Sequence, residues 1–450
     1  MKDVLELPQA LHEHLTSLRV AVYGSGGAPS HHLALLTHWG LYPHVVYAHD
    51  ILSGRLTDYD AVIFPGGGLS AMAGQLTPLG AEGMTALRHW TEAGGLYLGS
   101  CAGSCHPLRM GEAYTAAHPG AGAFQVCDVT PLNAAAGAWG LESPGTGRLQ
   151  VAPEAHPLFE GLYEPFEIVH YNGPLFPAVD GAAGRVVAPT DAFTPFEVSQ
   201  GDPHEATTLT RAITAGARVV YQQRVGTGQV ILFGSHPEFG WSALQLGWLP
   251  AARLLANALG LAHARACSAA HGHPGHLSSA MIGNILKEVQ GLEYLLGEAA
   301  PLEAGLPLGT PAFMGMSGPT LWDAAVGEAL CLLVTLRRWL EACPTGMPVR
   351  GLHLLEASPN PGQDVGFMGV RQGLSRACEM TQRALELPAP WPPFSGAYNE
   401  LATHPYHLLV SSYLSACGLI AANALQLSAF AVLNALPPLP LMYKEPFHAA

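Results

Sequence analysis

The chain has 450 residues, a formal net charge of −14 and only three lysines, at positions 2, 287 and 444. That length allows two or three domains, each with a core of its own. Because no cluster of Lys or Arg is present to neutralise a phosphate backbone, we expect no nucleic-acid partner. Eight cysteines without a C-x-x-C pair argue against a disulfide scaffold and a structural zinc site, and we expect neither a metal nor another cofactor.

The first part of the chain has the pattern of alternating strands and helices. Apolar runs at 18–23, 44–48 and 60–64 predict buried strands, and the leucine spacing at 30–39 predicts a helix. The glycine-rich turn at 24–27 lacks a nucleotide-binding motif, so a tight strand-to-helix turn explains it. The alternation predicts an α/β fold with an open, mostly parallel sheet. Acidic residues at the start, where a secretory signal would be apolar, lead us to expect a cytoplasmic protein.

A fourth apolar run, 96–98, leads directly into the sequence Gly-Ser-Cys-Ala-Gly. This arrangement is typical of a nucleophile on a sharp strand-to-helix turn, where Gly99 and Gly103 let the two elements approach. Cys101 would stand at a helix N-terminus, where free N–H groups and the helix dipole favour the thiolate. The Ala102 N–H would then be an oxyanion donor. The alternative is an inert, buried cysteine in a glycine-rich loop.

Two further segments place candidate partners at the carboxyl ends of predicted strands. Gly66 and Gly67 follow the third strand, and their N–H groups are candidates for the second oxyanion donor, with a flexible turn as the alternative. His236 and Glu238 follow a strand expected at 229–233 and can reach the same crevice as the cysteine, with a surface turn as the alternative.

These side chains have the chemistry of an acyl-transfer site. His236 would accept or hold the proton of Cys101, and Glu238 would orient the imidazole and stabilise its cation. The thiolate would attack an amide or ester carbonyl, giving an acyl-enzyme that water resolves. Tyr171 and Asn172 are candidate substrate-binding residues in the same crevice, although a polar turn explains them equally well.

The segments between these motifs are less regular. A helix is expected at 85–93, before the strand that carries the cysteine. Residues 110–147 are rich in Gly, Ala and Pro and are expected to form loops with a few short strands, followed by a strand at 148–151. A strand at 217–222 is expected to be joined by a turn to the one at 229–233.

Three motifs in this order resemble the class I glutamine amidotransferase-like superfamily: Pro65-Gly66-Gly67, Gly99-Ser100-Cys101-Ala102-Gly103 and His236-Pro237-Glu238. Residues 94–103, together with 171–174, look most like the domain found at the N-terminus of some biotin-protein ligases. The resemblance covers residues 17–262. It implies a flavodoxin-like fold and the roles of nucleophile, base and orienting carboxylate for Cys101, His236 and Glu238.

The resemblance does not make the chain a biotin ligase. There is no Gly-Arg-Gly-Arg adenylate loop, and no lysine stands between residues 3 and 286 to serve one. Neither a P-loop nor another recognisable synthetase domain is present to receive ammonia. A complete glutamine-dependent amidotransferase would therefore need a separate synthetase chain as a partner.

Residues 263–276 contain His263, Cys267 and His271 among Ala, Gly and Pro. This composition predicts a linker, with metal binding as the alternative. An all-α, bundle-like domain is expected over 277–450, from four helix-sized blocks at 277–299, 320–343, 367–387 and 406–436.

The stretch 408–436 has no charged residue and is long enough to span a bilayer, but its Ser, Asn and Gln residues favour a buried helix or a homodimer contact. We therefore expect no membrane association. Two hypotheses for function follow from the sequence. The first is a cysteine-dependent amidase or glutaminase-like hydrolase acting on a small-molecule amide, and the second is a catalytically silent ligand-binding or protein-interaction domain of the same fold.

Overall fold

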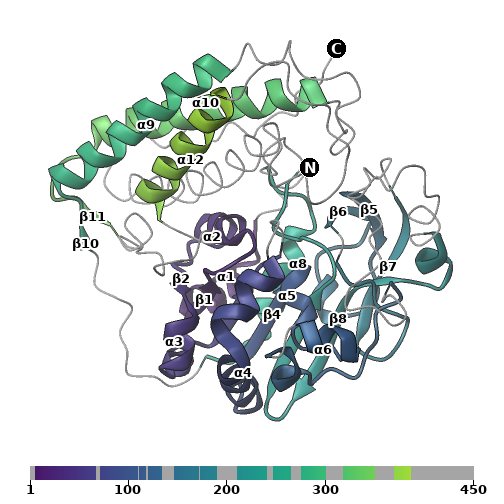
Figure 1. Cartoon of the computed structure of the whole chain (residues 1–450). Helices are drawn as coiled ribbons and strands as arrows, with labels where there is room; N and C mark the ends of the chain where they lie inside the picture. The colour runs from purple at the N-terminus through teal and green to yellow at the C-terminus, as the bar shows by residue number, and fades with distance from the viewer. Residues whose placement is uncertain are drawn as a thin grey trace.

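A computed structural model of the chain is shown in Figure 1. It describes residues 6–66, 71–109, 111–117, 120–133, 146–171, 173–189, 210–240, 247–264, 275–299, 318–349 and 369–386.

Within the described residues, nine strands form one sheet in the order β2-β1-β3-β4-β9-β8-β7-β5-β6. The strands are β1 (Val20–Tyr23), β2 (His44–Val46), β3 (Ala61–Phe64), β4 (Leu96–Ser100), β5 (Thr146–Ala152), β6 (Phe166–Tyr171), β7 (Ala182–Pro189), β8 (Arg218–Val225) and β9 (Gly228–Phe233). Neighbouring strands from β2 to β9 run parallel, and β8, β7, β5 and β6 continue the sheet with antiparallel pairings. The predicted α/β class and open sheet are confirmed.

The helices of this part of the chain are α1 (Gln9–Ser17), α2 (Pro29–His38), α3 (Ala48–Leu52), α4 (Ala71–Glu92), α5 (Ala102–Cys105), α6 (Glu112–Ala117) and α8 (Ala252–Leu259). Three short 3-10 turns accompany them: η1 (Arg55–Asp58), η2 (Ala121–Phe124) and η3 (Pro157–Phe159). The helix α1 precedes the predicted domain start at residue 17 and packs against α8.

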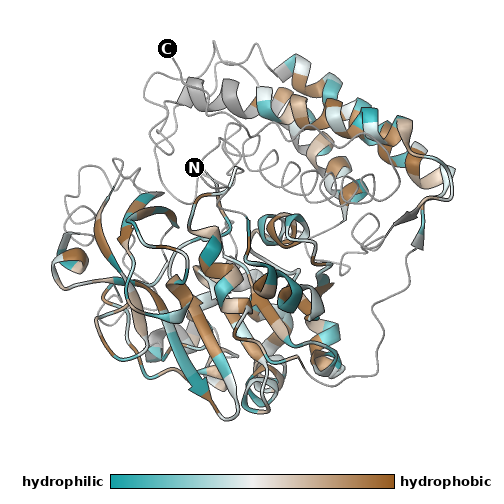
Figure 2. Ribbon diagram, turned by 180° about the vertical axis from the view of Figure 1, so that it is seen from behind, coloured by the Kyte–Doolittle hydropathy of each residue, from teal (hydrophilic) through white to brown (hydrophobic). Residues whose placement is uncertain are grey.

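Both faces of the parallel strands are buried, which explains why their sequences are continuously apolar rather than alternating. In β1, Val20 and Val22 join one core with α2 and α8, whereas Ala21 and Tyr23 join a second core with α3 and α4. Successive side chains of a strand point to opposite faces, so the two cores lie on opposite sides of the sheet. Figure 2 shows the hydrophobic runs along these strands.

Some elements differ from the sequence-based prediction. The helix expected at 85–93 is the second half of α4, which starts at Ala71 and has a kink at Gly80, two residues after Pro78. Because Pro and Gly both disfavour helix, the sequence did not predict the first half of α4. The described part of 110–147 contains the short helices α6 and η2 as well as loop, instead of loop with short strands. Strands β6 and β7 were not predicted. For β7 the reason is its content of Ala and Gly, which are depleted in strands.

The C-terminal region contains α9 (Ser279–Ala299), α10 (Gly318–Ala342) and α12 (Val370–Leu385), at three of the four predicted helical blocks. Helix α9 packs against both α10 and α12. This region is not purely helical, because β10 (Gly275–His276) pairs antiparallel with β11 (Pro348–Val349). The fourth block, 406–436, and most of the expected linker at 263–276 lie outside the described residues.

Candidate functional site

The candidate site lies at the carboxyl ends of neighbouring parallel strands, where open α/β sheets bind their ligands. Gly66 follows β3, Cys101 follows β4, and His236 and Glu238 follow β9. Because β3 pairs with β4 and β4 pairs with β9, these three strand ends are adjacent. The turn after β1 also reaches this edge, since the Ala28 N–H donates to the Gly66 carbonyl with an N···O distance of 2.8 Å.

The steric requirement of the turn around Cys101 is confirmed. A Cβ atom on Gly99 would lie 2.6 Å from the Gly103 carbonyl oxygen, and one on Gly103 would overlap the Phe64 carbonyl of β3. Ser104 anchors the turn, because its hydroxyl contacts the Gly99 and Phe233 carbonyl oxygens at 2.8 and 2.7 Å. Within the described residues, Cys101 is the one non-glycine residue with a positive φ, at 48°. Non-glycine residues rarely adopt this conformation, which marks nucleophile turns.

The helix after Cys101 is shorter than the sequence-based argument requires. Helix α5 has four residues, Ala102–Cys105. One turn of helix contributes little of the dipole that a long helix would direct at the sulfur. Stabilisation of a thiolate must therefore come from a neighbouring charge.

His236 supplies that neighbour, and Glu238 holds it. The His236 Nδ1 lies 2.7 Å from Glu238 Oε1, and both side chains are fully buried. The His236 ring is stacked on Phe239, with ring centroids 4.1 Å apart. The backbone N–H of His236 donates to the Val169 carbonyl of β6. Cys101 also acts electrostatically on the His236 side chain.

The buried charges favour an imidazolium and a carboxylate. Burial by itself disfavours a charged His236, but the Glu238 charge and the contacts with Cys101 raise the pKa of His236 to about 10. Burial also disfavours a charged Glu238, but His32, His236 and the hydrogen bonds to the carboxylate lower its pKa to about 2. At neutral pH the sulfur of Cys101 therefore faces a cation.

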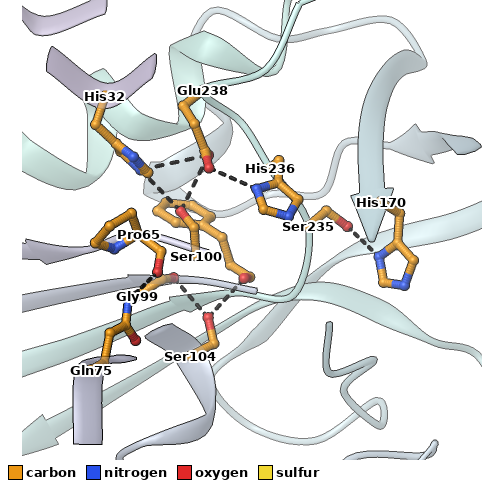
Figure 3. Close-up of polar contacts among 11 residues, drawn as sticks. His32, Pro65, Gln75, Gly99, Ser100, Ser104, His170, Ser235, His236 and Glu238 are labelled. Atoms are coloured by element: carbon orange, nitrogen blue, oxygen red, sulfur yellow. Dashed lines mark hydrogen bonds and ion pairs between the residues drawn. The ribbon is translucent and has the colours of Figure 1, made fainter. Parts of the chain in front are cut away.

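Two polar residues that the sequence analysis did not identify complete the surroundings of Glu238. His32 Nε2, from the first turns of α2, lies 3.6 Å from Glu238 Oε2 and 3.2 Å from the Ser100 hydroxyl oxygen. The Ser100 hydroxyl donates to the same carboxylate oxygen at 3.3 Å. Figure 3 shows His32, Ser100 and His236 arranged around the Glu238 carboxylate.

The structure describes Gly66 and Ala102, two of the three predicted oxyanion donors. A Cβ on Gly66 would overlap the Cys101 Cβ and lie 3.0 Å from His236 Cε1, so the Gly66 backbone borders the cysteine side chain and the imidazole. Ala102 is the first residue of α5, immediately after the nucleophile. Gly67 lies outside the described residues.

The candidate substrate-binding residues are only partly described. Tyr171 is the last residue of β6, and Asn172 lies outside the described residues. Their neighbour Gly173 contacts the site, because a Cβ there would lie 3.1 Å from the Cys101 Cα and overlap the Gly234 carbonyl. The segment after β6 therefore borders the cysteine from the antiparallel side of the sheet.

Comparisons with known proteins give a similarity in structure alone. No protein-family model and no curated protein matches the chain. A cytoplasmic protein from Salmonella typhimurium is similar, with a TM-score of 0.33 and 15% identity over 54% of this chain and 98% of that one. The beta-galactosidase from Rahnella sp. R3 has a TM-score of 0.26 and 16% identity, over 48% of this chain and 28% of the enzyme. The beta-galactosidase from Bacillus circulans sp. alkalophilus has a TM-score of 0.26 and 12% identity, over 49% of this chain and 29% of the enzyme.

At these identities and scores, function must be argued from the site. No group of three or more His, Cys, Asp and Glu side chains suited to a metal ion occurs among the described residues, which exclude Cys267 and His271. In the same part of the chain, no helix has the length and apolar character needed to cross a membrane. The uncharged stretch at 408–436 is outside it. Cys105 is buried, which raises the pKa of its thiol, and its sulfur contacts the Cys101 carbonyl.

Two signals in the sequence could have identified His32 and Ser100. Ser100 adjoins the candidate nucleophile, and His32 lies in the leucine-spaced stretch 30–39 that predicts a helix. A buried histidine usually has a polar partner. The identity of that partner depends on the sheet order, which brings α2 next to the end of β9.

Proposed function

We propose that the chain is a cysteine-dependent C–N hydrolase of the class I glutamine amidotransferase-like type, acting on a small-molecule amide. The observation that carries the proposal is the arrangement of Cys101 at a strained turn beside a His236 imidazolium that Glu238 orients. The order β2-β1-β3-β4-β9 of the parallel strands supports a flavodoxin-like fold for this part of the chain.

The proposed reaction uses each group in turn. The Cys101 thiolate attacks the amide carbon, and the Ala102 N–H, together with Gly66 or Gly67, stabilises the oxyanion. The His236 imidazolium donates its Nε2 proton to the leaving nitrogen as the C–N bond breaks, which releases ammonia or an amine. Neutral His236 then removes a proton from water, and the hydroxide displaces the cysteine from the acyl-enzyme to give a carboxylic acid.

The partners of this activity are part of the proposal. A small amide is the substrate, and Tyr171 and Asn172 are candidates to contact it. If the released ammonia is used in a synthesis, a separate synthetase chain receives it. The C-terminal helices are the proposed surface for that chain or for a second copy of this one.

One observation favours a second candidate, a catalytically silent binding domain of the same fold. Cys101 is only 7% exposed, and His236 and Glu238 are fully buried. A hydrogen-bonded polar network of this kind can serve as part of a rigid core without reacting with anything.

The pH dependence of Cys101 alkylation separates the two candidates. With iodoacetamide and peptide mass spectrometry, we expect Cys101 in the intact chain to react down to about pH 6, because the His236 cation stabilises the thiolate. In His236→Ala the reaction should rise only near about pH 8.5, the range of an ordinary thiol. The exposed Cys331 is a reference within the same molecule. Activated Cys101 would justify a screen of amides that begins with glutamine, whereas identical profiles in both proteins would favour the binding domain.

A further inference from the structure

We propose that His32 and Ser100 are positioning residues that hold the Glu238 carboxylate in the orientation that His236 needs. This inference rests on the proposed function for its catalytic meaning. It extends the chain of polar groups from the cysteine, through His236 and Glu238, to a histidine on the first helix after β1.

The hydrogen bonds allow one consistent assignment of protons. The Ser100 hydroxyl donates to Glu238 Oε2, so its oxygen is left to accept from His32 Nε2–H. His32 Nδ1 is buried and has no hydrogen-bond partner among the described residues, so it does not require a proton. Burial, the largest influence on His32, lowers its pKa, which also favours the neutral ring. His32 thus acts as a neutral donor, while His236 carries the positive charge.

The geometry of the Glu238 carboxylate gives His32 and His236 these different roles. Glu238 Oε1 accepts from His236 at 2.7 Å, and Oε2 faces both Ser100 and His32. A carboxylate with one oxygen unpaired could rotate away from His236 or bind a proton. Donors on both oxygens prevent rotation and favour the ionised form.

The other ionisable groups near this network do not replace the two donors. Glu238 is faced by His32 of α2 and by His236 of its own loop. His236 is faced in addition by Cys101 after β4 and by His170 of β6, where burial and the His236 charge lower the pKa of His170 to about 3. The His170 Nδ1 contacts the Ser235 hydroxyl at 3.0 Å rather than the carboxylate. Loss of His32 or Ser100 therefore leaves the Glu238 carboxylate with His236 and its own backbone N–H as donors, and weakens its support.

The test uses variants that remove or keep the donor. His32→Leu removes it at similar volume, whereas His32→Gln keeps an N–H near the position of Nε2. Ser100→Ala removes the second donor and is the alternative if His32→Leu does not fold. Thr37→Val is a control in the same helix, because Thr37 is buried and its hydroxyl has no hydrogen-bond partner among the described residues.

Two readouts are measured on the full chain. The first is the acid limb of Cys101 alkylation, which we expect to move up by on the order of one pH unit in His32→Leu and Ser100→Ala. At pH 6 this is about a tenfold loss of rate. The second is the titration of the His236 ring by 15N NMR, which should move to lower pH in the same two variants. His32→Gln should restore both values, and Thr37→Val should leave them unchanged.

The outcomes separate this inference from the proposed function. An unchanged His236 titration in both His32→Leu and Ser100→Ala overturns the positioning role, even if Cys101 is activated. A shifted His236 titration in a protein whose Cys101 behaves as an ordinary thiol supports the positioning role and contradicts the hydrolase. A shift of equal size in Thr37→Val would show a general effect of the helix and would also overturn the inference.

Discussion

Single residues are tightly constrained where β4, α5 and β3 approach one another around the cysteine. Gly99 and Gly103 were selected from the sequence because a nucleophile turn excludes side chains at these positions, and the structure shows backbone atoms where their Cβ atoms would lie. A backbone neighbour cannot move aside as a flexible side chain can. The glycine spacing therefore has a packing reason that is independent of whether Cys101 reacts.

Gly103→Ala tests this constraint on stability. The added methyl group would overlap the Phe64 carbonyl, so β3 or α5 must shift. We expect a loss of about 1–3 kcal/mol in the free energy of unfolding, as for other overpacked cores. Urea denaturation followed by tryptophan fluorescence measures it. A variant as stable as the wild type would show that the turn relaxes without cost.

The His236–Glu238 pair gives a residue-scale prediction for pH. The folded pKa of His236 is raised to about 10, so its contribution to stability is complete below about pH 6.5 and is lost as the pH rises towards 10. The folded pKa of Glu238 is lowered to about 2, so its contribution is complete above about pH 4.5 and is lost on acidification. The pair therefore stabilises the fold most between about pH 4.5 and 6.5.

This prediction is tested by comparing the melting temperature of the wild type with that of the double variant His236→Phe, Glu238→Leu. Both are measured from about pH 3 to about pH 9. The difference between the two proteins should be most in favour of the wild type near pH 5.5. It should shrink towards pH 9 and towards pH 3. A difference that does not change with pH would mean that the pair is not ionised as described.

At the scale of elements, the helices differ in how completely packing determines their sequences. Helix α2 is buried from Pro29 to Thr37, so packing constrains nearly all of its residues. Helix α9 has exposed positions, and Gly283 is one of them, with open space around its Cα. Glycine in the interior of a helix is destabilising where nothing requires it.

Gly283→Ala should therefore stabilise the C-terminal helices, by about 0.5–1 kcal/mol. The same exchange has the opposite expected sign at Gly103, which makes the two variants controls for each other. Thermal unfolding followed by far-UV circular dichroism should show a higher midpoint for the transition of these helices. A lower midpoint would indicate a partner for this face of α9 that the Cβ obstructs.

At the scale of the whole molecule, the two hydrophobic cores of the α/β sheet draw on residues from Leu15 to Ala262. The contacts of α1 extend this unit toward the N-terminus, since the His14 ring contacts the Ala262 carbonyl and Arg253 donates to the Glu6 carbonyl. Among the described residues, these two cores include none from the C-terminal helices.

We expect residues 1–264 to fold alone. Because both cores lie within this range, the fragment should unfold cooperatively in urea and keep the wild-type pH profile of Cys101 alkylation. Aggregation or loss of the profile would show that the C-terminal helices complete the site.

The sequence by itself determined the features that depend on local spacing. The apolar runs placed β1, β2, β3, β4 and β9, and glycine at 99 and 103 located the turn that carries Cys101, because strand periodicity and backbone sterics act over a few residues. The order Cys, His, Glu also suggested a candidate site before any contact was known.

Tertiary structure decided which of these groups meet. Ser100 and Glu238 are 138 positions apart, and His32 and Ser100 are 68 apart, yet all three share one carboxylate environment. No local pattern encodes such contacts, since they follow from the strand order that sets β1, β3, β4 and β9 side by side. Helix α5 ends after one turn, so the expected helix dipole contributes little at the cysteine. The charge next to the cysteine is instead the buried His236 imidazolium, which the same strand order brings there.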